Sequence, residues 1–242
     1  MYAFMSVVLE KLGAIRFVEE GVGVLCDAIQ IYAQLCIKTG IEDRQTLEVT
    51  VGKSSQAVRN AATQLLDLED EWDDFLGKVE ISGNENVKEM VGVGVKVPDE
   101  MRMTSVGVEG AAVGGENELG SAGCSVVVVT FGEERGAVRW QQETKCPFQY
   151  YRDQTRSLYT FLGLKRSVKA VWNTATLSYY GSEVAKGTPL PQGYTDLEDD
   201  PHQMGGDFIF DSTATLKFVY RSKTANDRPS VDRILQAIHN IQ

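Results

Sequence analysis

The sequence predicts a layered α/β fold in the second half of the chain, preceded by a helical N-terminal region. Strand-like and helix-like segments alternate between residues 125 and 162, an order that is typical of a sheet covered by helices. Two short apolar-rich runs follow at residues 207–211 and 216–221. Residues 212–215 between them have the length and polarity of a hairpin connection. Helical periodicity then returns near the C-terminus.

Length and composition indicate a globular chain with a substantial core. The chain has 242 residues and is 43% hydrophobic, which suits one large domain or one ordinary domain with an appendage. Its net charge is −10, and the excess acidity belongs to residues 1–120, which carry 21 acidic and 10 basic side chains. Phosphate binding needs a concentrated basic face, and the sequence shows none, so we expect no nucleic-acid partner.

The cysteines and the N-terminal segment indicate in which cellular compartment the protein is expected. Cysteines 26, 36, 124 and 146 form neither a dense disulfide framework nor a metal-ligand pattern, which favours a reducing environment. With only two histidines in the chain, no metal site is expected, and no motif predicts a cofactor. Glu10, Lys11 and Arg16 interrupt the apolar N-terminus before it reaches the roughly 18 residues of a membrane span. We therefore expect a cytoplasmic protein with no membrane partner.

Residues 1–82 are predicted to form the helical N-terminal region. Apolar residues recur at helical spacing in 2–12 and 22–37, and a third helix is expected from Ser54 or Ser55 to about Val79. This third helix carries an acidic run: Asp67, Glu69, Asp70, Glu71, Asp73 and Asp74. We interpret the run as a solvated helix face, with a cation site or a docking surface for a protein partner as the alternatives. Its spacing does not match a calcium loop.

The remaining elements follow in order along the chain. Glycines separate short valine-rich runs in residues 83–119, which predicts a flexible linker with one or two weak strands. A strand is then expected at 125–131, a helix at 133–144, a short strand at 147–151 and a helix at 153–162, followed by a long connection to the hairpin. The last helix is expected to begin near Asp227, with Pro229 in its first turn.

The amino-acid sequence of the second half resembles that of a known family. The segments AGCSVVVVTFGEERGAVRWQQETKCPF, YRDQTRSLYTFLGLKRSVKAVW, PHQMGGDFIFD and YRSKTANDRPSVDRIL resemble, in order and spacing, the peroxiredoxin-like AhpC/TSA antioxidant enzymes of the thioredoxin superfamily. The resemblance covers about residues 120–242. It implies a thioredoxin-like domain there, with a mixed sheet and flanking helices, preceded by the 1–82 region and the 83–119 linker. It also implies a thiol-dependent redox role.

The thiol motif of that family is missing from its expected place. The resemblance puts the working cysteine just after the first core strand, at the N-terminus of a helix, where thiolate is favoured. The stretch VKEMVGVGVKVPDEMRMTSVGVEGAAVGGENELG, which precedes Cys124, contains no cysteine. An alternative or mistaken exon would explain this, leaving the domain without its first strand-helix unit and with an exposed sheet edge.

The remaining cysteines are the candidates for any thiol chemistry. Cys146 precedes Pro147 in an expected loop and Cys124 precedes the buried strand, so Cys146 is the more exposed candidate and Cys124 the second, with structural roles as the alternative. Cys26 and Cys36 are expected to be core residues.

Two arginines, Arg221 and Arg228, flank the polar break after the hairpin. They are candidates for binding an anionic substrate or partner or for holding a thiolate, and pairing with Asp227 or Asp232 is the structural alternative. His239, near the end of the last helix, suits the helix dipole there, and nothing in the sequence pairs His202 with a cysteine.

Two function classes therefore stay open. One is a thiol-dependent antioxidant that uses a thiol reductant as its partner. The other is a catalytically inactive thioredoxin-like binding or regulatory module that docks a protein through its acidic N-terminal helix.

Overall fold

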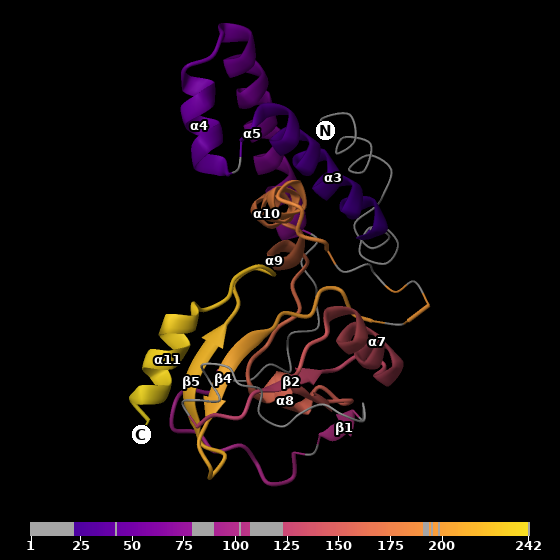
Figure 1. Cartoon of the computed structure of the whole chain (residues 1–242), viewed down its shortest axis with the longest axis vertical. Coiled ribbons are helices and arrows are strands. Elements are labelled where there is room, and N and C mark those ends of the chain that lie inside the picture. The colour runs from indigo at the N-terminus through magenta and orange to yellow at the C-terminus, as the bar shows by residue number, and fades with distance from the viewer. Residues whose placement is uncertain are drawn as a thin grey trace. The chain divides into compact units, whose positions relative to one another are not determined.

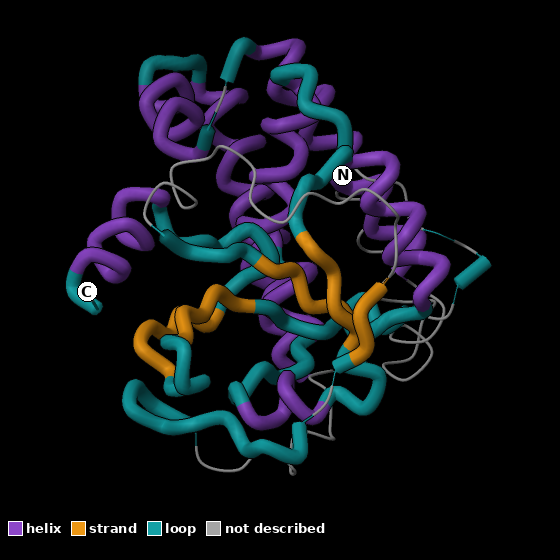
Figure 2. Tube along the Cα trace, turned by 60° about the horizontal axis from the view of Figure 1, so that its bottom comes forward, coloured by secondary structure: helices purple, strands orange, loops and turns teal. Residues whose placement is uncertain are grey.

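The computed structural model describes most of the chain, and its elements fall into two compact units. The described residues are 22–41, 43–78, 90–101, 103–106, 123–190, 194, 196–197 and 199–241. Unit 1 comprises residues 1–82, 167–192 and 224–226, and unit 2 comprises residues 83–166, 193–223 and 227–242. Figure 1 labels the elements, and Figure 2 colours helices and strands differently. By residue range, the described elements of unit 1 are helices, and every described strand belongs to unit 2. No helix in the described ranges is long and apolar enough to cross a membrane.

Unit 1 is built around two long helices. These are α3 (Val22–Thr39) and α5 (Gln56–Lys78), and both were predicted from apolar periodicity. Ser55 accepts a hydrogen bond from Val58 N at 3.4 Å, as expected of an N-cap. A short helix that was not predicted, α4 (Arg44–Gly52), lies between them and is capped by Asp43. The predicted helix at 2–12 lies outside the described residues.

Two further helices of unit 1 come from the middle of the chain. α9 (Val168–Trp172) and α10 (Thr174–Ala185) occupy part of the stretch for which we predicted only a long connection. Both begin with a regular cap: Ser167 Oγ accepts from Ala170 N, and Asn173 Oδ1 accepts from Thr176 N, each at 2.9 Å.

Because α10 packs along α3, and α9 packs against α5, these helices belong to unit 1 and not to the sheet-bearing unit. The core of unit 1 contains Ala28, Ile29, Tyr32 and Leu177. The predicted domain boundaries at residues 82 and 119 fall next to or within undescribed stretches and stay a prediction.

The acidic run on α5 is only partly a solvated face. Asp67, Asp70, Glu71 and Asp74 are exposed, as the sequence predicted. Glu69 is instead 3% exposed and accepts a hydrogen bond from the Tyr32 hydroxyl at 2.8 Å. Asp73 accepts from Thr174 N at 2.9 Å and Thr174 Oγ1 at 3.2 Å, at the start of α10. The interpretation as a solvated face is therefore wrong for these two carboxylates, which join α5 to its neighbours.

Unit 2 contains a three-stranded mixed sheet covered by helices. Its strands are β1 (Thr104–Val106), β2 (Val127–Thr130) and β3 (Gln149–Arg152), in the order β1-β3-β2. β2 and β3 are parallel and are joined through α7 (Glu134–Thr144), whereas β1 pairs antiparallel with β3. This confirms the predicted alternation of strand and helix. β1 is one weak strand of the kind expected in the glycine-rich region.

The predicted helix at 153–162 is shorter in the structure. α8 covers only Ser157–Phe161, because residues 153–156 form a turn whose last residue, Arg156, has a left-handed φ of 55°. Asp153 lies before this helix with 0% exposure and accepts hydrogen bonds from the backbone nitrogens of Ser157 and Leu158 at 3.0 and 2.8 Å. Its carboxylate therefore satisfies free donors at the start of the helix.

The hairpin and the last helix complete unit 2. β4 (Gly206–Phe210) and β5 (Leu216–Arg221) pair antiparallel as predicted, and Figure 1 shows α11 (Val231–His239) beside them. The predicted start of this helix near Asp227 is wrong: Ser230 is the N-cap and Pro229 precedes it. Asp227 is instead held by the Tyr220 hydroxyl and by Lys223 N.

The expected single thioredoxin-like sheet is not formed within the described residues. The hairpin is a separate two-stranded sheet from β1-β3-β2. A segment of the glycine-rich region lies beside β5, where Gly94 N donates to Leu216 O at 2.8 Å and Leu216 N donates to Val95 O at 2.9 Å. What the structure establishes is an arrangement of helices with small sheets.

Candidate functional site

Cys146 lies at the point where α7 ends and β3 begins. Lys145 closes α7 in a left-handed conformation, with φ of 53°, and turns the chain so that Cys146 follows the last helical turn directly. Gln141 fixes this turn from within α7: its Nε2 donates to Cys146 O at 3.4 Å and to Phe148 O at 3.2 Å. The Cys146 side chain is half-buried and free of any disulfide.

The sheet places a tyrosine beside this thiol. Tyr150 is on the central strand β3, opposite Val106 of β1 and Val128 of β2, and is 2% exposed. Cys146 and Ala137 pack in the same apolar cluster as Tyr150. Burial and the neighbouring Cys146 thiol raise the pKa of the Tyr150 hydroxyl, with an opposing contribution from Thr144. The structure therefore places Cys146 in the same cluster as a hydroxyl whose protonated form is favoured.

The other described cysteines differ in their surroundings. Cys124 is half-buried and lies just before β2, as the sequence predicted. Cys36 is on α3 of unit 1, where burial raises the pKa of its thiol, with weaker opposing effects of a backbone hydrogen bond and of Lys186. It is half-buried, although we expected a core residue. The side chain of Cys26 lies outside the described part of the chain.

Arg221 serves the fold of unit 2. Its Nε donates to Leu162 O and its Nη2 donates to Val91 O, each at 2.6 Å. Burial lowers the pKa of its guanidinium. The side chain therefore fastens the end of α8 and the glycine-rich region to β5. Its prediction as an anion-binding residue stays untested by these contacts.

Arg228 follows β5 in the chain, and in space its side chain lies near the start of β4. Its Nη1 is 3.6 Å from Asp207 Oδ2 and 3.3 Å from Ser222 Oγ. Its ion-pair partner is therefore Asp207, and not Asp227 or Asp232 as the structural alternative had it, although the charge of Arg228 is one of the weaker causes that lower the pKa of Asp227. The two predicted arginines thus have different partners, and within the described residues no hydrogen bond joins either of them to a cysteine.

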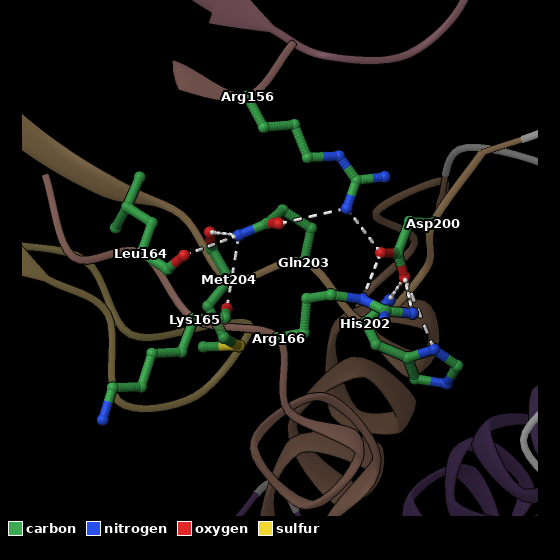
Figure 3. A network of polar contacts seen from close by, with 8 residues as sticks. All are labelled: Arg156, Leu164, Lys165, Arg166, Asp200, His202, Gln203 and Met204. Atoms are coloured by element: carbon green, nitrogen blue, oxygen red, sulfur yellow. Dashed lines mark hydrogen bonds and ion pairs between the residues drawn. The ribbon is translucent and has the colours of Figure 1, made fainter. Parts of the chain in front are cut away.

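A polar network that the sequence did not reveal lies in the connection before β4. Asp200 is its centre, and Figure 3 shows Arg156, Arg166 and His202 converging on this carboxylate. Asp200 Oδ2 is 2.8 Å from Arg156 Nη1 and 2.5 Å from Arg166 Nε, and Oδ1 is 3.6 Å from His202 Nδ1. Burial alone would raise the pKa of Asp200, but the hydrogen bonds from His202 and the two arginines outweigh it and hold this pKa well below its ordinary value.

Gln203 extends the network to the backbone. Its Nε2 donates to the carbonyls of Leu164, Lys165 and Met204 at 3.1 to 3.3 Å, and its Oε1 accepts from Arg156 Nη1 at 3.4 Å. His202 is 2% exposed, and its Nε2 has no hydrogen-bond partner in the described ranges. The sequence could not reveal this cluster. Arg156 and Arg166 lie between β3 and α9, and Asp200 and His202 follow some 40 residues later, so the four residues do not form a sequence motif.

The described residues contain no cluster of side chains that could hold a metal ion. Within the residues that the structure covers, no three His, Cys, Asp or Glu side chains are grouped as metal ligands. What the arrangement offers is a half-buried thiol beside a buried hydroxyl, and a separate carboxylate locked by two guanidinium groups.

Comparison with known proteins adds a family match over part of the chain. The searches of curated proteins and of solved structures found no match. The family model described as AhpC/TSA antioxidant enzyme matches residues 116–224, which include Cys124, Cys146, Tyr150 and the Asp200 network. This is the region in which the sequence resembled that family, and the match implies a thioredoxin-like fold and a redox role for it. Over residues 116–224, the chain is similar to the AhpC/TSA antioxidant-enzyme family.

Proposed function

We propose that the chain is a peroxiredoxin-like protein whose thiol-dependent redox role is carried by Cys146 within a thioredoxin-like domain. The observation that supports this most is the position of a half-buried, disulfide-free thiol beside the buried Tyr150 hydroxyl inside the family segment. Free cysteines at positions 36, 124 and 146 also suit the reducing conditions of the cytoplasm.

The chemistry proposed is the reduction of a peroxide by the Cys146 thiolate. The sulfur attacks one peroxide oxygen, an S–O bond forms as the O–O bond breaks, and the departing oxyanion takes a proton from water. A thiol reductant then displaces water from the sulfenic acid to give a mixed disulfide, and its second thiol releases Cys146. The protein partner in this scheme is therefore a dithiol reductant.

Peroxide consumption by the full chain tests this proposal. Hydrogen peroxide and dithiothreitol would be supplied to the unmodified protein and to the Cys146→Ser and Cys124→Ser variants. Turnover is expected in the unmodified protein and in Cys124→Ser, and its loss is expected in Cys146→Ser. No turnover by the unmodified protein would contradict the proposal, and loss in Cys124→Ser alone would move the redox role to Cys124.

A second function is supported by a different observation. The stretch before Cys124 has no cysteine, and the hairpin and the three-stranded sheet are separate in the described chain. Both features suit a thioredoxin-like domain that lacks its first strand-helix unit and acts as a catalytically inactive binding or regulatory module. The exposed carboxylates of α5 would face its partner: Asp67, Asp70, Glu71 and Asp74.

Capture of partners by the full chain separates this alternative from the first. A variant with Asp67→Asn, Asp70→Asn, Glu71→Gln and Asp74→Asn removes the charge and keeps the side-chain shapes. A partner that binds the unmodified chain, dissociates at raised salt and is lost in this variant would support the module. Binding that survives the four substitutions would contradict a role for the acidic face.

A further inference from the structure

The Tyr150 hydroxyl is a buried polar group in an unusual state. The residue is 2% exposed, and its hydroxyl oxygen has no hydrogen-bond partner among the residues that the structure describes. Its ring is held on the helix-covered face of the sheet, 5.9 Å from the Trp140 ring, centroid to centroid. Buried hydroxyls are normally hydrogen-bonded, so an unpartnered one marks a position where a partner is to be expected.

Two side chains at the end of α7 act on this hydroxyl, the Cys146 thiol and the Thr144 hydroxyl, and the thiol is the one that can become charged. Cys146 packs against the cluster that contains Tyr150, and its thiol is one of the causes that favour the protonated form of the hydroxyl. A thiol is a weak acceptor, whereas a thiolate is a strong, charged acceptor. The hydroxyl therefore gains a good partner when Cys146 ionises.

The position of Cys146 at the end of a helix makes a hydrogen-bond donor the relevant group to look for. Reactive cysteines are commonly placed at helix N-termini, where the helix dipole stabilises the thiolate. Cys146 instead follows the C-terminal end of α7, which carries partial negative charge. The end of α7 therefore does not favour the thiolate, so a group that favours it has to come from elsewhere in the fold.

We propose that Tyr150 is a positioning residue for Cys146, donating its hydroxyl hydrogen to the thiolate sulfur. The inference rests on the proposed redox role of this cysteine. When the thiol ionises, its proton goes to solvent, while Tyr150 keeps its own proton and only reorients its O–H bond. Gln141 fixes the backbone that carries the sulfur near Tyr150, because its Nε2 donates to the backbone carbonyls of Cys146 and Phe148.

The test is the pH dependence of Cys146 alkylation in the full 242-residue chain. Iodoacetamide would label the folded protein at a series of pH values, and mass spectrometry would quantify each cysteine peptide. In Tyr150→Phe, the Cys146 rate near neutral pH is expected to fall about tenfold, and the midpoint of its pH profile is expected to move to higher pH. Phe keeps the ring in the cluster, so a purely structural role would leave this midpoint unchanged.

Tyr151→Phe is the matched control. Tyr151 is the next residue on β3 and points to the opposite face of the sheet, so its variant should leave the Cys146 profile unchanged. Cys36 and Cys124 in the same samples report any general loosening of the fold. An unchanged Cys146 midpoint in Tyr150→Phe, or the same shift in Tyr151→Phe, would overturn the inference.

A second substitution guards against a folding defect. Replacing Tyr150 with 3,5-difluorotyrosine keeps the hydroxyl and strengthens its donation, so the Cys146 midpoint should move to lower pH. A shift to higher pH there would overturn the inference. Because alkylation needs no peroxide, absence of peroxide turnover would contradict the proposed function alone, whereas an unchanged alkylation profile would contradict the role of Tyr150 alone.

Discussion

Single residues of unit 2 hold the connection before the hairpin, and Asp200 is the most important of them. Its carboxylate is 9% exposed and lies between two guanidinium groups and a histidine that is itself buried. The adjacent Asp199 is in the opposite situation: burial and the charge of Glu133 raise the pKa of Asp199. The pKa values of these neighbouring carboxylates are thus shifted in opposite directions, because three side chains hydrogen-bond Asp200, whereas the Arg156 charge only partly opposes the rise at Asp199.

Asp200→Asn is expected to lower the free energy of unfolding by about 1 to 3 kcal/mol at pH 7, less than a fully buried pair because both arginines are about one-third exposed. Urea unfolding measures this change. Asp199→Asn is the control and should change stability little, since the Asp199 side chain is exposed. Equal losses in the two variants would contradict the role given to the network.

The same carboxylate predicts a pH dependence. The folded state holds the pKa of Asp200 below its unfolded value of about 3.9, so its contribution is present above that pH and is lost as the pH falls below it. The difference in unfolding free energy between the unmodified chain and Asp200→Asn should therefore shrink between pH 6 and pH 3. A constant difference over this range would show that the charge of Asp200 is not what stabilises the fold.

At the scale of elements, the close approach of α10 to α3 decides how unit 1 is packed. A Cβ on Gly181 of α10 would lie 2.4 Å from Tyr32 Cβ and 3.0 Å from two backbone atoms of α3, Ala33 N and Ile29 O. The glycine therefore lets the two helix backbones approach each other. Asp73 of α5 holds the first turn of the same helix α10 through Thr174.

Gly181→Ala is expected to lower the free energy of unfolding by about 1 to 3 kcal/mol, because backbone atoms of α3 cannot move aside as a flexible side chain can. Gly77→Ala on α5 is the matched control. Its added Cβ would meet only the Lys169 side chain, at 3.7 Å, and should stabilise the helix by about 0.5 to 1 kcal/mol. Thermal unfolding of both variants gives the comparison, and a stable Gly181→Ala protein would contradict the close packing.

Asp73→Ala is expected to cost about 0.5 to 2 kcal/mol, because it removes a carboxylate that accepts from the backbone nitrogen of Thr174 at the start of α10. Asp74→Ala, one residue further on the same helix, removes an exposed carboxylate and should have little effect. Denaturant unfolding at pH 7 measures both. If the two variants lose equal stability, the carboxylate of Asp73 does not support α10.

For the whole molecule, the main feature is that unit 1 is assembled from distant parts of the chain. Residues 167–192 and 224–226 join the N-terminal helices, although they lie on either side of a segment that belongs to unit 2. Leu177 of α10 is 1% exposed because Ala28, Ile29 and Tyr32 of α3 cover it. The N-terminal region is therefore required to bury the apolar face of a helix from the second half.

A chain of residues 83–242 tests this interdependence. Without α3 and α5, the apolar face of α10 would be exposed, and we expect binding of a hydrophobic dye and aggregation on size-exclusion chromatography. The full chain is the control and should show neither. A monomeric 83–242 chain with cooperative unfolding would contradict the expectation and support an independent C-terminal domain.

Much of the local structure could be predicted from the sequence. Helical periodicity located α3 and α5, and the β-branched run and the alternating pattern located β2, β3, α7 and the hairpin. The starts of helices were less certain: residues around Asp227 and Pro229 matched a helix start, yet Ser230 provides the cap. Among candidate site residues, Cys146 was located in the correct loop, but its neighbour Tyr150 was not singled out.

The sequence by itself determined the strands of the sheet and the hairpin and the helices α3, α5 and α7, and its residues 120–242 resemble the family whose model matches residues 116–224. Only the tertiary structure decided which elements pack together and which polar groups are buried. Asp73 and Thr174 are 101 residues apart, and Arg221 and Val91 are 130 residues apart. Periodicity and caps depend on residues within a few positions of each other, whereas such contacts depend on chain topology, which local patterns do not encode.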